Sequence, residues 1–487
     1  MYEMKDARGS GGPGPGKTRM KALLFFLLIV ILLVPASVLV LQKAAEALGT
    51  HNASSLPSPS ISPSSELFPI ACNLLPEARE RENALFASAP DGSILKYTID
   101  PRLQNEMQSY LNTTAPPYAL FIAIEPSTGR ILAMNSSSRE MGWGLDAFYR
   151  LFPMASLFKM VTASAALEKA LINPSTEISY RGRAVSENPN NWDITQKKGG
   201  HSMNVTEAMG RSVNPVYGKI ASDMLGRDAL MATCDIFGFN RQLFREIPVQ
   251  PSQANIEGTQ YGLRLSGSGL DHELKVSPLH AALITAAFAN KGVMLSPRLV
   301  ESVTANGKEL KTNAAVEMGR IVKPRVAEEL TSMLVTTVTT GTSAKAFRTH
   351  DARRLSSVMK VAAKTGTLNG DNPSGQHTWF AAYAPAENPK IAVLSLIIND
   401  DRWKIKASNV GEHALTTYFS NEIAAAPAPV AVKKVPVKRA AKHNVRKKSS
   451  EKSPAKLKAK KTNRVKNDRH QAARKKTVRS SHRGKGG

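Results

Sequence analysis

A run of twenty uncharged, mostly aliphatic residues at positions 22–41 is the feature that most constrains how this chain can fold. As an α-helix this run spans about 30 Å, the hydrocarbon thickness of a bilayer. Five basic residues precede it and only Lys43 follows closely, so the positive-inside rule keeps residues 1–21 in the cytoplasm and exports the chain after residue 42. A cleavable signal peptide is the alternative, but Lys43 and Glu46 crowd any cleavage site. We therefore predict a single-pass anchor in the cytoplasmic (inner) membrane, with the remainder on the periplasmic or extracytoplasmic side.

Two segments of biased composition set the limits of the folded part. Residues 42–67 form a Ser/Pro-rich linker, and residues 425–487 hold 22 Lys and Arg against two acidic residues. This tail carries +20 of the net charge of +26, and it has no Phe, Trp or Tyr with which to build a core or stack on bases. We expect the tail to be disordered and residues 68–424 to form the globular domain, which is long enough to bury a substantial core.

The predicted topology places the basic tail across the membrane from DNA, which argues against nucleic acid as its partner. Anionic envelope polymers or lipid head groups fit its charge. A solvated tail without a specific partner is an equal alternative.

The globular part has strand-like segments at both ends and helical segments between them. Residues 119–124, 131–134, 358–364, 378–383 and 391–398 have strand character. Residues 155–170, 278–290, 325–337 and a final segment near 412–419 have helical character. We predict an α+β fold in which an antiparallel sheet joins the two ends of the domain, flanked by helices on both faces, with a helical subdomain from the middle of the chain.

Two features of the sequence point to chemistry that the chain does not support. Residues 11–18 (GGPGPGKT) match the phosphate-binding P-loop, but that loop needs a strand before it and a soluble helix after it. Cys72 and Cys234 are too few for a disulfide scaffold and lie far from any His cluster, so we predict no metal site. Export permits a disulfide between the two cysteines, and two unpaired thiols are an equal alternative.

The informative signal is a set of three short motifs in order along the chain, of which the first is SLFK at Ser156–Lys159. A serine hydroxyl is a poor nucleophile unless a base within hydrogen-bond reach takes its proton. Helix positions i and i+3 share a face, so Lys159 Nζ can lie beside Ser156 Oγ. Pro153 suits the start of that helix, where free amides help to bind an oxyanion. The same pattern recurs by chance at Ser449 and Ser453 in the tail.

The second motif (SVN) runs from Ser212 to Asn214 and offers a hydroxyl that can pass protons and an amide that can bind substrate. The third (KTGT) runs from Lys364 to Thr367 at the predicted end of a strand, where an ammonium and a hydroxyl suit a carboxylate and Gly366 lets a substrate backbone approach. Each motif alone is a weak signal, and residues 186–188 (SEN) hold a second copy of the S-x-N pattern. Their order and their placement on suitable elements make the set informative.

With these motifs in place, residues from roughly 90 to 420 resemble the penicillin-binding proteins, the penicillin-recognising serine acyltransferases that also include the serine β-lactamases. Weaker patches agree: YTIDPRLQ at 97–104, SPLH at 277–280, Gly341-Thr342, and TWFAAY at 378–383.

The resemblance implies a role for each motif residue. Ser156 is the acylated nucleophile, Lys159 is the base that activates it, and Ser212 and Asn214 stand opposite them. Lys364 and Thr365 hold the carboxylate of the substrate or of a β-lactam, with Gly366 beside them. The amides of Ser156 and Thr367 form the oxyanion hole.

Lys159 can act as a base near neutral pH only if its pKa falls well below the reference of about 10.4. Burial and the nearby charge of Lys364 both lower it. The histidines offer no better mechanism, because the G-x-S-x-G and H-E-x-x-H patterns are absent. We expect His280 and His377 to serve in packing or hydrogen bonding.

The resemblance further implies a peptidoglycan D,D-transpeptidase without a cofactor, whose partners are stem peptides ending in D-Ala-D-Ala and β-lactams. About seventy-five residues separate the predicted anchor from the first strand, too few for a glycosyltransferase domain, so we expect a monofunctional enzyme. A D,D-carboxypeptidase, with water as the acceptor, is an alternative, and a non-catalytic penicillin-binding sensor or scaffold is another. Residues 245–250 lack the E-x-x-L-N segment of class A β-lactamases, and the class D signature is a poor match.

Overall fold

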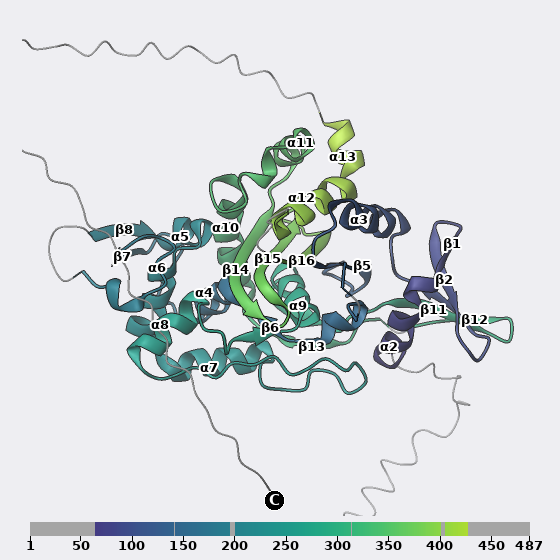
Figure 1. Ribbon diagram of the computed structural model, residues 1–487, viewed down its shortest axis with the longest axis horizontal. Coiled ribbons are helices and arrows are strands. Elements are labelled where there is room, and N and C mark those ends of the chain that lie inside the picture. Colours follow the sequence, from purple (N-terminus) through teal and green to yellow (C-terminus); the bar gives the residue numbers. More distant parts are fainter. Residues whose placement is uncertain (1–63, 141, 195–199, 313, 401–404, 427–487) are drawn as a thin grey trace, which may run out of the picture. The chain divides into compact units, whose positions relative to one another are not determined.

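The computed structural model describes residues 64–140, 142–194, 200–312, 314–400 and 405–426, and Figure 1 shows how their elements are arranged. The predicted anchor at 22–41, the linker up to residue 63 and the basic tail from residue 427 lie outside these ranges. Within the described ranges, no helix is both long and apolar enough to cross a bilayer.

An antiparallel five-stranded sheet joins strands from the two ends of the domain, as the sequence predicts. In spatial order its strands are β14 (Ala362–Asp371), β15 (Ser374–Ala384), β16 (Ile391–Asn399), β4 (Tyr118–Ile124) and β5 (Ile131–Ser138). Every residue of β16 is buried, because both faces of the sheet are covered there, and seven of its nine residues are apolar. β14 lies at the edge of this sheet, paired with β15 on one side only.

Helices cover both faces of this sheet (Figure 1). α9 (Pro278–Ala289) packs against β4, β15 and β16, and all of its residues are buried. The opposite face is covered by α3 (Pro101–Thr114), α11 (His350–Val358) and α12 (Ala407–Tyr418), after which α13 (Ser420–Ala425) follows. Side chains alternate along each strand, so Ile122 belongs to the core shared with α9 and Phe121 to the core shared with α12.

The middle of the chain forms the predicted helical region. Its elements are α4 (Phe158–Glu168), α5 (Val205–Arg211), α6 (Asn214–Lys219), the π-helical segment η5 (Ile220–Leu225), α7 (Gly226–Phe237), α8 (Gln260–Ser268) and α10 (Pro324–Thr339). α4 contacts α7, α8 and α10, and its residues from Phe158 to Leu167 are all buried. A helix enclosed in this way has no solvent-exposed polar stripe, and its polar residues Lys159, Thr162 and Ser164 are buried with the apolar ones.

The structure also contains short strands that sequence analysis did not predict. A second five-stranded sheet has the order β1 (Arg79–Arg81), β2 (Ala84–Ser88), β3 (Ile94–Tyr97), β11 (Val300–Ala305) and β12 (Lys308–Lys311), preceded in the chain by α2 (Ser64–Leu74). Three two-stranded pairs are β6 (Phe152–Pro153) with β9 (Lys275–Val276), β7 (Glu177–Arg181) with β8 (Gly200–Asn204), and β10 (Val293–Leu295) with β13 (Glu317–Arg320). Four of them, β1, β6, β9 and β10, have only two or three residues, too few to show an alternation. β2, β3 and β7 do alternate in burial, over four or five residues, and their pattern was overlooked.

Two expectations about local structure were wrong. Val358 ends α11 instead of opening a strand, and β14 begins only at Ala362. The KTGT motif therefore lies inside β14 and not at its end, because β14 stays paired with β15 as far as Asp371. The predicted helical segment does begin at Ala155, and Pro153, just ahead of it, belongs to the short strand β6.

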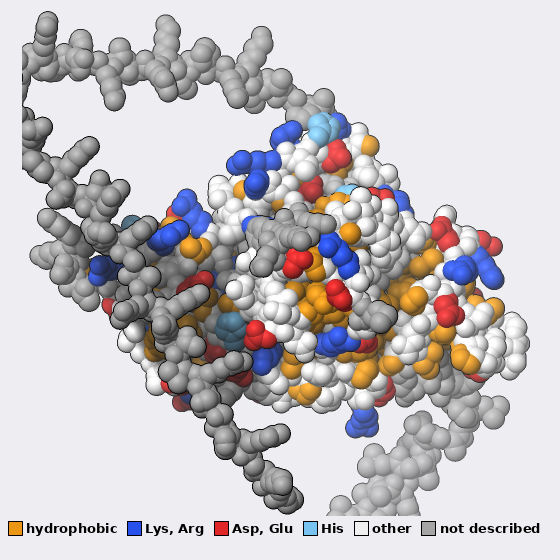
Figure 2. All heavy atoms as spheres, viewed as in Figure 1, with side chains coloured by type: hydrophobic (Ala, Val, Ile, Leu, Met, Phe, Trp, Pro, Cys, Tyr) orange, Lys and Arg blue, Asp and Glu red, His pale blue; other side chains and the backbone are white. Residues whose placement is uncertain are grey.

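Cys72 and Cys234 are free thiols, and both are buried in the same core. Burial raises the pKa of Cys72 to about 11 and that of Cys234 to about 12. The structure therefore corresponds to the unpaired alternative. Figure 2 shows basic and acidic side chains interspersed over one face of the described residues, in keeping with the low net charge of the chain outside its tail.

Candidate active site

The backbone around Ser156 is closely packed. Ser156 lies in a short 3-10 turn, η3 (Ala155–Leu157), between β6 and α4, and Ala155 adopts the left-handed conformation with φ 53°. A Cβ placed on Gly269 would lie 2.1 Å from the carbonyl oxygen of Ala155, and one placed on Gly366 would lie 3.3 Å from the Ala155 Cβ. A side chain at position 269 would therefore displace the backbone that carries Ser156.

Lys159 is fully buried, and its amine has three oxygen neighbours. Nζ lies 2.7 Å from Ser156 Oγ, 2.8 Å from Asn214 Oδ1 and 2.6 Å from the carbonyl oxygen of Ser268. Burial first, and the nearby Lys364 second, lower the pKa of Lys159 well below its usual value. A neutral amine has two N–H groups and one lone pair. Donation to Asn214 and Ser268 leaves the lone pair for the proton of the Ser156 hydroxyl.

The second motif connects the two buried lysines. Ser212 has the left-handed conformation with φ 56°, which lets the chain turn after α5 and start α6 at Asn214. Ser212 Oγ accepts a hydrogen bond from Lys364 Nζ at 2.9 Å. The Asn214 side chain is fixed at both ends, because Oδ1 accepts from Lys159 and Nδ2 donates to the carbonyl of Ser186 at 3.2 Å.

The third motif lies on the edge strand β14. Lys364 is fully buried, and its Nζ donates to Ser212 and, at 2.7 Å, to the carbonyl of Thr365. Burial lowers the pKa of Lys364 to about 7. The Thr365 hydroxyl lies 2.6 Å from that of Thr342, in the turn after α10. An anion in the site would therefore stabilise the protonated form of Lys364.

A cavity of about 320 Å³ opens onto these motifs. It is lined by six of the eight predicted site residues: Ser156, Ser212, Asn214, Thr365, Gly366 and Thr367. The other two, Lys159 and Lys364, are buried behind the wall and hydrogen-bonded to Ser156 and Ser212. The structure therefore brings together all eight predicted residues, although they are spread over more than 200 positions of sequence.

The rest of the lining is mixed in polarity. It comprises Val185, Glu187, Arg211, Leu270, Thr342, Thr378, Trp379, Lys406, Ala407 and Ser408. Arg211 and Lys406 are cations, and Glu187 is the one carboxylate among the described lining residues. This balance favours a substrate with negative charge.

Sequence reasoning missed several parts of the site. The Ser268 carbonyl contacts Lys159, and Gly269 makes room for Ala155. The SGSG run at 266–269 was an available signal, since small residues often mark a close approach of two backbones. A main-chain acceptor leaves no side-chain signature, so its role could not be found from the letters.

The SEN copy of the second motif belongs to the wall of the site. It lies in the loop after β7, where the Ser186 carbonyl accepts from Asn214 and Glu187 lines the cavity. From the sequence this copy served only to show that the S-x-N pattern is a weak signal, and it was not predicted to belong to the site.

The predicted histidine roles agree with the structure. His280 is buried, with Nδ1 2.7 Å from Ser252 Oγ and Nε2 2.9 Å from the carbonyl of Phe237. His377 is buried, with Nε2 2.8 Å from the carbonyl of Pro373. Among the described residues, no group of three or more His, Cys, Asp or Glu side chains could hold a metal ion.

Comparison with known proteins agrees with this geometry. Residues 119–416 match the family model of the penicillin binding protein transpeptidase domain. Peptidoglycan D,D-transpeptidase PbpA of Mycolicibacterium smegmatis is 26% identical over 351 residues, covering 63% of this chain and 68% of that protein. The protein of the same name from Mycobacterium tuberculosis is 26% identical over 359 residues, covering 64% and 68%.

Solved structures have the same fold. The crystal structure of PBPA from Mycobacterium tuberculosis covers 67% of this chain and 82% of its own, with a TM-score of 0.55 and 24% identity. The family model covers more than half of the 487 residues and includes all three motifs. This chain therefore belongs to the family of penicillin-binding protein transpeptidases that its motifs indicated.

Proposed function

We propose that this protein is a membrane-anchored peptidoglycan D,D-transpeptidase that cross-links stem peptides through an acyl-enzyme at Ser156 and is acylated there by β-lactams. The observation that carries the proposal is the environment of Lys159, whose amine lies 2.7 Å from Ser156 Oγ with acceptors for both of its N–H groups. The PbpA relatives are named D,D-transpeptidases, and structures of PBPA from Mycobacterium tuberculosis include a penicillin G acyl-enzyme complex.

In the acylation step, Ser156 Oγ attacks the carbonyl carbon of the penultimate D-Ala while Lys159 takes the hydroxyl proton. The bond from that carbon to the terminal D-Ala nitrogen then breaks, and the leaving amine receives the proton from Lys159. The amides of Ser156 and Thr367 bind the oxyanion between these events. A positioned base of this kind contributes about 10²- to 10⁴-fold in rate.

The transfer step runs in the opposite direction. The amine of a second stem peptide attacks the ester carbon, Lys159 takes the amine proton, and the bond to Ser156 Oγ breaks as the serine recovers a proton. With water as the nucleophile the same sequence gives a D,D-carboxypeptidase. The two outcomes are separated by product analysis with a D-Ala-D-Ala pentapeptide, with and without an acceptor amine.

Lys364 and Thr365 hold the terminal carboxylate of the donor peptide. Thr365 lines the cavity, and Lys364 supplies positive charge from behind the wall, next to Ser212. A bound carboxylate raises the pKa of Lys364, so carboxylate binding and protonation of this lysine favour each other.

We further propose that residues 22–41 anchor the enzyme in the cytoplasmic membrane, with the catalytic domain and the basic tail on the extracytoplasmic side. The basic residues of the leader support this orientation. The tail then meets anionic envelope polymers or lipid head groups, which its charge suits.

Ser156→Ala should abolish covalent labelling by a fluorescent penicillin, because it removes the attacking oxygen. The fold should persist, which circular dichroism and thermal melting would show. Ser449→Ala and Ser453→Ala, in the chance copies of the motif, are the matched controls and should label normally. Labelling of the Ser156→Ala protein would refute the assignment of the nucleophile.

Lys364→Ala should lower the second-order rate constant for penicillin acylation at least tenfold, since a hydrogen bond to a charged group contributes about 1.5–3 kcal/mol. Acylation needs neutral Lys159 and protonated Lys364, so the wild-type rate constant should rise with pH as Lys159 loses its proton. It should fall again above about 7 as Lys364 loses its own. The alanine variant should lack this alkaline fall. If the alanine variant reacts like the wild type at every pH, Lys364 has no role in binding the carboxylate.

The penicilloyl adduct on Ser156 should persist for many minutes, because a missing base for water typically costs about 10²- to 10⁴-fold in rate. Intact mass spectrometry after a pulse of penicillin would measure its lifetime. Glu187→Gln is the control, since Glu187 is the one described carboxylate that lines the cavity. Rapid loss of the adduct, slowed by this substitution, would show a β-lactamase with Glu187 as its base.

A reporter that is active only after export should be active when fused after residue 424. The protein should also stay with the membrane during carbonate extraction. Deletion of residues 22–41 should release it from the membrane fraction. Reporter activity confined to the cytoplasm would invert the proposed orientation.

A further inference from the structure

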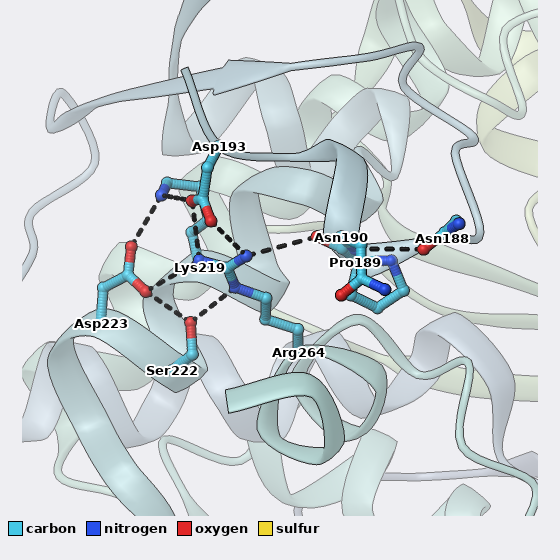
Figure 3. Close-up of polar contacts among 8 residues, drawn as sticks. All are labelled: Asn188, Pro189, Asn190, Asp193, Lys219, Ser222, Asp223 and Arg264. Carbon is cyan, nitrogen blue, oxygen red and sulfur yellow. Dashed lines mark hydrogen bonds and ion pairs between the residues drawn. The ribbon is translucent and has the colours of Figure 1, made fainter. Parts of the chain in front are cut away.

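Arg264, Asp193, Lys219 and Asp223 form a charged network (Figure 3). It joins three parts of the chain: α8, the loop after β7, and α6 with the segment η5 that continues it and carries Asp223. Arg264 on α8 makes a forked pair with Asp193, with Nη1 to Oδ2 at 2.8 Å and Nη2 to Oδ1 at 2.7 Å. Lys219 on α6 bridges Asp193 at 2.9 Å and Asp223 at 2.7 Å. Two cations and two carboxylates balance, so the network has no formal net charge.

The Arg264 guanidinium is the buried centre of this network, with 3% of the side chain exposed against 43% for Asp193. Its other donors are also used, Nη1 to the carbonyl of Pro189 at 3.3 Å and Nε to Ser222 Oγ at 3.1 Å. Removing an ion pair from water rarely stabilises a fold more than apolar packing would. What a fully bonded guanidinium adds is a fixed geometry among the groups that it contacts.

Two of the joined elements supply the acceptors of the Lys159 amine. Arg264 lies one turn before Ser268 on α8, and the Ser268 carbonyl accepts from Lys159 Nζ at 2.6 Å. Lys219 ends α6, which begins with Asn214, and Asn214 Oδ1 is the other acceptor at 2.8 Å.

The third element is the loop after β7, which contains Asp193 and fixes Asn214. The carbonyl of Ser186 accepts from Asn214 Nδ2 at 3.2 Å, and that of Ala184 accepts from the Asn214 backbone N–H at 2.8 Å. Trp192, next to Asp193 and fully buried, donates from Nε1 to Ser186 Oγ at 3.0 Å. A displacement of Asp193 would therefore also displace the Ser186 and Ala184 carbonyls that orient Asn214.

We propose that Arg264 and Asp193 are positioning residues for acylation: their fork holds both acceptors of the Lys159 amine in place and so aims its lone pair at Ser156 Oγ. This inference rests on the proposed role of Lys159 as the base. Neither residue of the fork lines the cavity, so neither touches the substrate. Loss of the fork should therefore slow the acylation step and leave the affinity for the substrate nearly unchanged. A misplacement of about 1 Å in a catalytic group can lower a rate about 10²-fold.

The test separates binding from chemistry. Stopped-flow kinetics with a fluorescent penicillin over a range of concentrations gives the dissociation constant of the initial complex and the acylation rate constant at saturation. Arg264→Met removes the fork, and Asp193 keeps its bridge to Lys219 and remains half exposed, so no buried charge is left alone. Arg264→Lys keeps the charge without the fork.

A matched control is Arg354→Met. Arg354 also ties two elements together, α11 to α13, through the carbonyls of Ile423 and Ala426, and it does not line the cavity. Its loss should lower the melting temperature without changing the acylation rate constant of the folded protein.

We expect Arg264→Met to lower the acylation rate constant about 10- to 100-fold with a change of less than about threefold in the dissociation constant. Arg264→Lys and Asp193→Asn should be intermediate. Two results would contradict the proposal and leave the network a structural role only. One is a wild-type acylation rate constant in Arg264→Met; the other is a loss of acylation rate in Arg354→Met as large as that in Arg264→Met. A wild-type protein that penicillin does not acylate at all would instead refute the proposed function, and the inference with it.

Discussion

Two lysine amines buried in one wall of a cavity are the constraint on which the rest of this structure depends. Burial without a carboxylate partner lowers the pKa of both, and among the described residues neither Lys159 nor Lys364 forms an ion pair with an acid. A nearby acid would raise the pKa of Lys159 toward its ordinary value, and Lys159 could then not serve as the proposed base. The site must therefore hold its amines with neutral oxygens, which come from Ser156, Ser212, Asn214 and two main-chain carbonyls.

A main-chain oxygen can reach a buried amine only if two backbone segments lie close together. In this structure glycines occupy such points of close approach. Gly269 follows Ser268 in the chain, and its backbone lies against Ala155, the residue before Ser156. A Cβ on Gly210, two residues before Ser212, would lie 2.3 Å from Thr336 Oγ1 on α10. One on Gly341 would lie 2.1 Å from the Gly210 carbonyl oxygen. These contacts fix the turn that carries Ser212 against α10, and the edge of the sheet presents Lys364 to it.

Much of the fold and most of the site could be predicted from the sequence, because their signals are side-chain patterns. The mostly apolar segments at 119–124 and 391–398 predicted strands, which the structure shows as β4 and β16. The i, i+3 spacing of Ser156 and Lys159 predicted a contact, which the structure shows at 2.7 Å. The second sheet was missed because its strands are short: β1 has three exposed residues and no pattern, and the alternation of β2 and β3 extends over only four or five residues. The end of α11 at Val358 was mistaken for strand because Val358-Met359 has strand-like composition.

The parts that escaped prediction share a physical cause. The Ser268 and Ser186 carbonyls act through main-chain atoms that every residue type possesses, so no letter of the sequence identifies them. Substitution at those positions cannot remove such an acceptor; only a shift of the backbone can. The positions of these acceptors therefore depend on the groups that hold the backbone in place, and such groups need not lie in the motifs or touch the substrate. A chance S-x-x-K such as the one at Ser449 has the same two side chains but lies in a tail without the aromatic residues of a core. The motif residues Ser156 and Asn214 supply two of the three oxygen neighbours of the Lys159 amine, and only a packed domain can place the third, the Ser268 carbonyl.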